Sequence, residues 1–466
     1  MDAYLTNCLD FLDEGLSPFH AAKAAADRLR AAGYTELPEC DAWEPVPGGR
    51  YFTTRNGSSV IAWRMPETGG TGAYDETDQA PLLRGWRGTC SHSDSPTFRI
   101  SKANAGEKDG YGRVRIEEYG GPRWPVWMDR PLRVAGRLFV RTDGGIEPVL
   151  VKTDALLVIP TLCCHFDRDG RFGEKLNMSQ DMQPILGAAG LADASSEGEA
   201  VSDGAGADDL LAAVRKAADL PDDAEIVDFD LVLALNEDAT VIGPNEDLFC
   251  SQRIDDLASA AATLDGFLRA GESDAPSDVC DLWCMFDNEE VGSQTRQGAA
   301  SSFLPDVMAR IGEALGLSCG DAVRARANAL FLSVDNGHAT HPNHPEKSDP
   351  AHPIALNAGV VVKYTANQKY TTTAMTAALF TEICRRAGVP TQAFYNRPDV
   401  IGGGTLGNIL SRAVSVPMVD IGLPQLSMHS AMETAGTRDV AYMVRAVEAF
   451  YGTRLVQTAD GSWTIG

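Results

Sequence analysis

Several apolar runs in this sequence end directly in residues whose side chains can bind metal ions. One run continues into Glu289 and Glu290, a second ends at Asp335, and a third leads toward His429. Buried strands of open α/β sheets read as continuous apolar runs, and ligands bind beyond the carboxyl ends of such strands. The pattern therefore predicts that three separate segments bring carboxylates or an imidazole to one edge of a sheet.

Two further segments carry residues of the same chemical types. His92 and Asp94 form a His-x-Asp element, in which the carboxylate can hold the imidazole by its second nitrogen. Asp255 and Asp256 precede a helical pattern, and a carboxylate at that place could bridge two cations. Nitrogen and oxygen ligands of this kind suit zinc, cobalt or manganese. Each element alone also fits an ordinary surface turn, a helix cap or a solvated face.

Half of the eight histidines lie in one proline-rich loop. A loop so rich in imidazoles could bind a metal itself, could form the rim of a substrate site, or could simply be solvated. These histidines are His338, His341, His344 and His352.

The elements that would position these residues follow from hydrophobic periodicity. From about residue 250 onward, apolar runs alternate with helical patterns, which indicates an α/β sheet. Residues 3–33 read as one or two amphipathic helices, and residues 50–64 read as a β-hairpin with its turn at Asn56-Gly57. The further helices are expected at residues 256–269, 298–316, 370–387, 404–414 and 437–451.

The hydrophobic pattern of residues 97–249 differs from that of the rest of the chain. Short alternating apolar runs there predict a β-rich module, whose last strand places Leu231, Leu233 and Leu235 on one face. Within the module, residues 187–210 are rich in Ala, Gly, Ser and Asp, so we expect a mobile surface loop there.

Composition narrows the class of protein. A chain of 466 residues, 44% hydrophobic and 23% charged, is typical of a globular protein with two or three domains. The net charge of −25 argues against a nucleic-acid partner. We see no signal peptide and no apolar run that could span a membrane. Ten cysteines without a framework indicate reduced, mostly buried thiols and a cytoplasmic protein.

The order of these elements along the chain resembles the M18 aminopeptidase family, the aspartyl aminopeptidases and their relatives. The resemblance covers nearly the whole chain except residues 187–210. The matching stretches are residues 55–57, 91–96, 253–257, 287–293, 335–343, 363–370, 403–407 and 426–430.

The resemblance implies a fold, an activity and an assembly. The expected fold is an α/β catalytic domain of the phosphorylase/hydrolase-like kind, built from residues 1–96 and 250–466. Residues 97–249 would form an inserted β-rich dimerisation domain. The implied reaction is metal-assisted hydrolysis of the N-terminal peptide bond of peptide substrates. The implied assembly is a homo-oligomer, a dodecamer.

The same resemblance implies a site for two divalent ions, with zinc expected first and cobalt or manganese as alternatives. His92, Asp255 and Asp335 would hold one ion. Asp255, Glu290 and His429 would hold the other, so that Asp255 bridges the two.

Three further residues receive roles from the resemblance. Glu289 resembles the general base, and Asp94 resembles the residue that supports the ligand His92. His165 is similar to a family histidine that reaches the active site of a neighbouring subunit. From the sequence alone, His165 is a single histidine after an apolar run, which is equally typical of a core or cap position.

Substrate preference depends on Lys363, which matches a family lysine beside the pocket and predicts a preference for N-terminal Asp or Glu. Lys363 could instead be a solvated charge at a strand end. Ser348 and Met432 depart from the family at the substrate rim, which keeps a preference for neutral residues open. The other residues expected on the substrate side are His338, Tyr370 and Gly403.

Two other functions remain compatible with the sequence. The same metal ligands could serve a different two-metal hydrolase, such as a deacylase of small amides. A catalytically silent shell or cargo protein could keep only the assembly. One departure lies beside the bridge itself, because Asp256 stands where the family usually has Asn.

Overall fold

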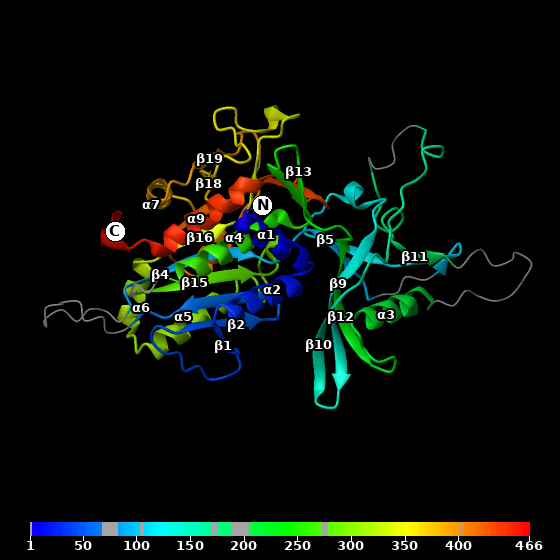
Figure 1. Ribbon diagram of the computed structural model, residues 1–466, viewed down its shortest axis with the longest axis horizontal. Helices are drawn as coiled ribbons and strands as arrows, with labels where there is room; N and C mark the ends of the chain where they lie inside the picture. Colours follow the sequence, from blue (N-terminus) through cyan, green and yellow to red (C-terminus); the bar gives the residue numbers. More distant parts are fainter. Residues whose placement is uncertain are drawn as a thin grey trace, which may run out of the picture.

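The computed structural model of the protein describes residues 2–67, 83–102, 107–168, 175–188, 205–272, 278–400 and 402–466. Within these ranges the chain is a mixed α/β protein with several sheets (Figure 1).

The largest sheet has nine strands in the order β1-β2-β3-β15-β4-β16-β20-β18-β19. Its four central strands, β15, β4, β16 and β20, are parallel neighbours, so their carboxyl ends lie at one edge. Most side chains of these strands are buried, as the continuous apolar runs predict. The strands are β1 Thr35–Glu36, β2 Arg50–Arg55, β3 Ser59–Arg64, β4 Gly85–His92, β15 Val279–Phe286, β16 Leu330–Val334, β18 Val360–Tyr364, β19 Thr391–Tyr395 and β20 Met418–Gly422.

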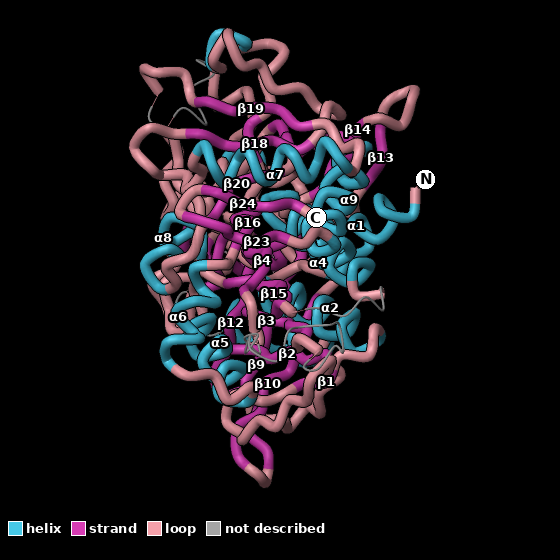
Figure 2. The backbone as a smooth tube through the Cα atoms, turned by 90° about the vertical axis from the view of Figure 1, so that its left-hand side faces the viewer, coloured by secondary structure: helices cyan, strands magenta, loops and turns pink. Residues whose placement is uncertain are grey.

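Helices cover both faces of this sheet, which explains why the side chains of its central strands are buried almost throughout. One buried cluster joins α1, α2, α4, α7 and α9 to the sheet, and another joins α5, α6 and α8 to its opposite face. Figure 2 shows α5, α6 and α8 on one side of the strands and α1, α4 and α9 on the other. The helices are α1 Ala3–Glu14, α2 Pro18–Ala31, α4 Ile254–Ala270, α5 Phe303–Ala314, α6 Cys319–Ala327, α7 Ala374–Arg386, α8 Leu406–Ala413 and α9 Thr437–Gly452.

The first elements form for the local reasons that the sequence indicates. The amphipathic stretch near the N-terminus is two helices, and Ser17 begins the second by accepting the backbone N–H of His20 at 3.4 Å. Strands β2 and β3 pair as the predicted hairpin, with Asn56 and Gly57 at positive φ in the turn.

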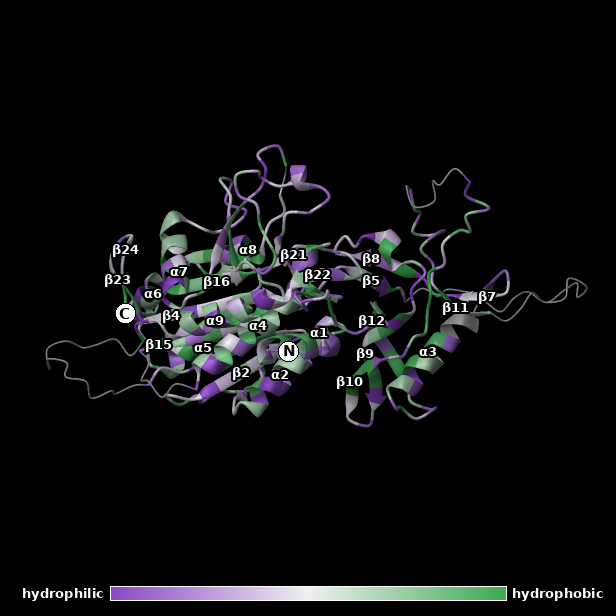
Figure 3. Cartoon of the chain, turned by 45° about the horizontal axis from the view of Figure 1, so that its top comes forward, coloured by the Kyte–Doolittle hydropathy of each residue, from purple (hydrophilic) through white to green (hydrophobic). Residues whose placement is uncertain are grey.

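A second group of sheets lies to one side of the large sheet (Figure 3). Five strands run in the order β10-β9-β12-β5-β8, and three more in the order β11-β7-β6. Leu231, Leu233 and Leu235 of β12 point into a common core, as their alternation predicts. These elements are β5 Thr97–Ile100, β6 Glu107–Lys108, β7 Tyr111–Arg113, β8 Ile116–Tyr119, η1 Trp124–Trp127, β9 Leu132–Thr142, β10 Gly145–Lys152, β11 Ile185–Ala188, α3 Ala205–Ala217 and β12 Ile226–Leu235.

A third sheet, in the order β13-β14-β22-β21-β17, connects segments that are far apart in the sequence. It pairs residues just before α4 with strands near the C-terminus, and so brings the start of α4 close to the segment that holds His429. The remaining elements are β13 Thr240–Ile242, β14 Leu248–Ser251, η2 Glu289–Val291, β17 Gly337–His338, η3 Pro345–Lys347, β21 Pro424–Leu426, β22 Glu433–Gly436, β23 Leu455–Ala459 and β24 Ser462–Ile465.

The structure corrects one expected loop and contains one helix that the sequence did not predict. The surface loop expected at residues 187–210 is wrong at both ends, because residues 187–188 end β11 and residues 205–210 begin α3. Its middle part lies outside the described residues. Leu210 and Val214, four residues apart, are buried on one face of α3, and this spacing is the signal that the Ala- and Gly-rich composition obscured. Helix α6 was not predicted.

The cysteines are all free, as expected, but they are less buried than the composition suggested. Cys8, Cys90, Cys280, Cys284 and Cys384 are buried, whereas Cys40, Cys163, Cys164 and Cys319 are exposed.

Within the described ranges, no helix is both long enough and apolar enough to cross a membrane.

Candidate active site

The carboxyl edge of the large sheet collects the residues that could bind metal ions. His92 is the last residue of β4, Asp335 directly follows β16, and Glu290 lies in the short helix after β15. His429 follows β21, and Asp255 lies at the start of α4, where its backbone angles are not helical. Five segments that are far apart in the sequence therefore meet at one place.

Two groups of possible ligands share one carboxylate. His92, Asp255 and Asp335 each offer an atom within 4.8 Å of the others, and so do Asp255, Glu290 and His429. Asp255 lies between the two imidazoles, with its Oδ1 atom 3.6 Å from Nε2 of His92 and its Oδ2 atom 3.6 Å from Nε2 of His429. The structure thus brings together all five ligands that the resemblance implies.

The chemistry of this group fits divalent cations. Asp255 is buried, and its Oδ1 atom accepts no hydrogen bond from the described residues. Such an atom is costly to bury unless a ligand such as a metal ion satisfies it. Imidazole nitrogens and carboxylate oxygens are the donors that zinc accepts.

The electrostatics lead to the same conclusion. Burial, reinforced by the charge of Asp255, raises the pKa of Glu290 well above its ordinary value. Burial also raises the pKa of Asp335, although Lys363 acts against this. Burial tends to lower the pKa of His92, but the acidic groups around it, Asp255 first among them, together raise this pKa well above its ordinary value. Carboxylates this close together in a buried site repel one another, and cations between them would remove that repulsion.

Glu289 lies beside the ligands and is held by Asp94. The backbone N–H groups of Glu289 and Glu290 donate to the two carboxylate oxygens of Asp94, at 3.0 and 3.1 Å. Nδ1 of His92 lies 3.0 Å from the main-chain oxygen of Asp94, so Asp94 contacts the imidazole mainly through its backbone. Burial raises the pKa of Glu289 to about 8, with His92 acting in the opposite direction. A carboxylate tuned in this way is suited to exchanging protons near neutral pH.

Two residues that the sequence analysis missed support these ligands. The hydroxyl of Tyr119, at the end of β8, donates to Asp94 at 2.7 Å and so connects the second group of sheets to the site. The buried carboxylate of Glu433 accepts the backbone N–H of Asp255 at 2.9 Å and that of His429 at 2.7 Å. Neither residue belongs to a recognisable motif, and each reaches the site only through strand pairing.

A cavity of about 240 Å³ opens directly onto the ligands. It contains all four residues expected on the substrate side, together with Glu289 and apolar side chains. Its lining is His92, Asp255, Glu289, Glu290, Asp335, Asn336, Gly337, His338, Lys363, Tyr370, Phe394, Gly403, Gly404, Met428 and His429.

Lys363 is not the solvated strand-end charge that was one of the two alternatives. Its ammonium is buried, donates to Oδ1 of Asp335 at 3.1 Å, and donates to the main-chain oxygen of Asn336 at 2.8 Å. Burial tends to lower its pKa, yet the charge of Asp335 raises it, so Lys363 keeps its proton. Its positive charge is therefore already partly neutralised by Asp335.

The histidines of the proline-rich loop lie in different surroundings. His338 lines the cavity, and burial lowers its pKa, so that it is neutral at pH 7. His344 and His352 contact acidic neighbours in their own loop. In the part of the chain that the structure describes, this loop forms no group of three possible metal ligands.

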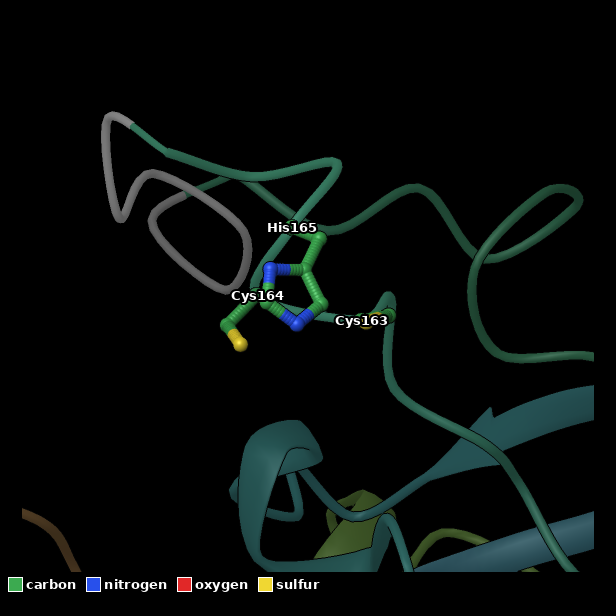
Figure 4. A group of neighbouring side chains, drawn as sticks. All are labelled: Cys163, Cys164 and His165. Carbon is green, nitrogen blue, oxygen red and sulfur yellow. The ribbon is translucent and has the colours of Figure 1, made fainter.

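His165 lies outside the cavity. It belongs to an exposed turn in the second group of sheets, next to Cys163 and Cys164 (Figure 4). The large apolar side chains on either side of the three, Leu162 and Phe166, are 46% and 81% exposed. The chain therefore does not itself bring His165 to the residues at the sheet edge.

Carboxylates and imidazoles at the carboxyl edge of a helix-covered α/β sheet, with a cavity beside them, define a metal-dependent hydrolase. Comparison with known proteins identifies the family. Residues 11–451 match the family model described as "Aminopeptidase I zinc metalloprotease (M18)". The chain belongs to the M18 family of aminopeptidases, which are metallo-hydrolases that use zinc.

Individual relatives are similar over most of their lengths. The "Probable M18 family aminopeptidase 2" of Pseudomonas putida (strain GB-1) is 37% identical over 455 residues, which are 97% of this chain and 99% of that one. The structure described as "Cryo-EM structure of the Ape4 and Nbr1 complex" has a TM-score of 0.88 and 31% identity, covering 96% of this chain and 85% of that one. The "Structure of S. cerevesiae mApe1 dodecamer" has a TM-score of 0.80 and 25% identity, covering 96% of both.

Proposed function

We propose that the protein removes the N-terminal residue of peptides by hydrolysis at a centre of two metal ions. The observation that carries this proposal is the bridging position of Asp255 between the two groups of possible ligands. His92 and Asp335 would complete the first site, and Glu290 and His429 the second. We also propose that residues 1–96 and 250–466 form a phosphorylase/hydrolase-like catalytic domain, with residues 97–249 as an inserted dimerisation domain.

Two such ions would lower the pKa of a bound water and polarise the scissile carbonyl. Zinc fits the donor set, and cobalt or manganese would fit it as well. Glu289 would act as general base, taking a proton from the attacking water and passing it to the leaving amine. Asp94 would keep Glu289 in place through the hydrogen bond that it accepts from the backbone.

An aminopeptidase must also bind the free amine of its substrate. Carboxylates of the cavity, such as Glu289 and Glu290, can pair with an ammonium group. The first side chain would then lie toward Lys363, His338 and Tyr370, with the backbone of Gly403 beside it.

The preferred first residue is proposed to be Asp or Glu, because Lys363 is the buried cation of this cavity wall. A charge-assisted contact with its ammonium would favour an acidic side chain by roughly 1.5–3 kcal/mol. The second candidate is a preference for a neutral first residue, and a separate observation supports it. Lys363 already pairs with Asp335, and Phe394 and Met428 line the same cavity, which favours a neutral first residue.

We further propose that the chain works as a homo-oligomer, a dodecamer, in which His165 acts at the cavity of a neighbouring subunit. The exposed apolar residues Leu162 and Phe166 beside it support this proposal, because such side chains are usually covered by a partner. The similarity to a structure described as a dodecamer also supports the proposed assembly.

A panel of matched substrates tests the proposed reaction. Each aminoacyl substrate is offered with a free amine and with an acetylated amine, to protein loaded with zinc, cobalt or manganese. The proposal predicts hydrolysis of the free-amine member alone. Equal hydrolysis of both members would favour the deacylase, and hydrolysis of neither under any metal would favour the silent shell.

A further inference from the structure

The exposed turn that carries His165 also carries two thiols. Cys163, Cys164 and His165 are consecutive, all three are exposed, and their ligand atoms lie within 4.8 Å of one another. Figure 4 shows the imidazole ring drawn between the two cysteines. We propose that these three residues form a binding site for one soft, thiophilic metal ion of the zinc or copper(I) class, distinct from the oxygen-rich centre.

The turn itself is held in a defined shape. The backbone N–H of Phe166 donates to the main-chain oxygen of Cys163 at 2.9 Å, which closes the turn. At its start, Thr161 donates its N–H and its hydroxyl to the two carboxylate oxygens of Asp129, at 2.9 and 2.7 Å. The three side chains are therefore presented together by an anchored segment.

The two thiols are available as ligands because they are poorly placed to pair with each other. Consecutive Cα atoms lie about 3.8 Å apart, whereas disulfides usually join Cα atoms about 4.4–6.8 Å apart. Both Cys163 and Cys164 are free in the structure. Thiolates select soft ions, and an imidazole completes a donor set that zinc or copper(I) accepts.

The geometry needs only small adjustment. Ligand atoms around a tetrahedral zinc ion lie roughly 3.3–3.8 Å apart, given zinc–sulfur and zinc–nitrogen distances of about 2.0–2.3 Å. The present separations reach at most 4.8 Å, and exposed side chains can close that difference by rotating. Three ligands from one turn leave a further position for water or for a group from another chain. An imidazole that binds the ion through one ring nitrogen keeps its second nitrogen available, so His165 can still act at the cavity of a neighbouring subunit.

Cadmium titration of the zinc-loaded protein tests the site, because thiolate-to-cadmium charge transfer absorbs in the ultraviolet and the catalytic ligands contain no sulfur. We expect absorption that saturates at one equivalent per chain and disappears in the double variant Cys163→Ser/Cys164→Ser. His165→Ala should weaken binding at least about tenfold, since it removes one of three ligands. The matched control is Cys40→Ser/Cys319→Ser, which removes the other two exposed thiols and should leave the titration unchanged.

Metal analysis provides a second readout. Protein purified from cells should contain about one soft ion more per chain than the Cys163→Ser/Cys164→Ser variant. The proposal is overturned if the double variant titrates like the unchanged protein, if the control variant loses the absorption, or if no absorption develops at one equivalent.

A second inference concerns Glu433 and depends on the proposed metal centre. One carboxylate accepts the backbone N–H of both Asp255 and His429, one of which is the bridging ligand. His429 adopts positive φ, at 65°, which is unfavourable for a side chain other than glycine. The geometry points to Glu433 as a positioning residue that fixes these two ligands relative to each other.

Asp439 offers a matched control. It is also a buried carboxylate that accepts two backbone N–H groups, those of Asn357 and Gly359, but it holds no proposed ligand. Glu433→Gln turns one acceptor into a donor, so we expect metal affinity to fall about 10- to 100-fold. Asp439→Asn should lower thermal stability without lowering metal affinity.

Titration of metal-free protein with zinc, followed by calorimetry, separates the outcomes. The titration is compared in the Cys163→Ser/Cys164→Ser background, which lacks the site proposed on the turn. Two ions bound there, and weakened binding after Glu433→Gln alone, would support the inference. Equal affinity in Glu433→Gln and the unchanged protein would overturn it while leaving the metal centre intact. An unchanged protein that binds no zinc would instead overturn the proposed function.

Discussion

Two regions of this chain carry clusters of possible metal ligands, and they are built in opposite ways. At the edge of the large sheet, side chains from five distant segments meet in a buried place, and neighbours such as Asp94 and Glu433 hold their backbones. On the turn near His165, three consecutive exposed residues stand together at the surface, and the hydrogen bonds that hold the turn are made by Phe166 and Thr161.

This difference shows which functions one chain can perform alone and which require a second chain. The fold itself prearranges the buried group, so metal binding should be a property of each chain. His165 lies outside the cavity of its own chain, so its role in hydrolysis should depend on assembly.

The largest effect is expected from Asp255→Ala. Asp255 belongs to both groups of possible ligands, and its removal should cost both ions and reduce hydrolysis to background. Metal content after dialysis measures the first effect, and a free-amine substrate measures the second. Retention of two ions per chain would show that Asp255 is not the bridge.

Glu289→Gln should separate binding from chemistry. The amide keeps the size of the side chain but cannot take a proton, so turnover should fall about 10²–10⁴-fold while both ions stay bound. Steady-state kinetics and metal analysis are run on the same sample. Near-normal turnover with full metal content would remove Glu289 from its role.

Mixed assemblies address the exposed turn. His165→Ala subunits keep Glu289, and Glu289→Gln subunits keep His165, so a mixture that is allowed to reassemble should contain some sites with both residues. We expect activity above the sum of the two separate variants, and light scattering should show that activity follows a large homo-oligomer. No gain on mixing, or a fully active monomer, would place all the catalytic residues in one chain.

Lys363→Met tests specificity inside the cavity. Loss of the ammonium should reduce the preference for Asp over Leu at the first position roughly 10- to 150-fold in kcat/KM. Lys369→Met is the control, because Lys369 donates to the main-chain oxygen of Gly402 instead of Asp335. A Leu substrate that is faster already in the unchanged protein would favour the neutral preference.

The smallest effect is expected from Asp256→Asn. Asp256 is buried and accepts the backbone N–H of His92 at 3.2 Å, and burial raises its pKa well above the ordinary value. An amide keeps an oxygen that can accept the same N–H of His92, so the substitution should change metal content and kcat/KM little. A large loss of metal would mean that Asp256 carries a charge that the centre needs.

Much of the buried region could be predicted from the sequence because its signals are local. Apolar runs that lead into Glu290 and Asp335 predict the edge of the sheet, and His92 with Asp94 forms a recognisable pair. The contributions of Tyr119 and Glu433 could not be predicted, because they depend on the pairing of distant strands. The ion pair of Lys363 with Asp335 likewise appears only when β16 and β18 are placed in space.

Composition alone gives a wrong prediction within the second group of sheets. Ala- and Gly-rich sequence around residue 205 suggested a loop, although burial of Leu210 and Val214 stabilises a helix there. Tertiary packing overrides local propensity in such segments. Cys163 and Cys164 are adjacent in the sequence, but only the turn brings their thiols close to the imidazole of His165.

Anomalous diffraction from crystals of the zinc-loaded protein would locate the metal ions of the proposed centre. We expect two zinc peaks at the sheet edge, with a different oxygen of Asp255 coordinating each ion, His92 and Asp335 on one, and Glu290 and His429 on the other. A single peak, or two peaks that do not share Asp255, would contradict it.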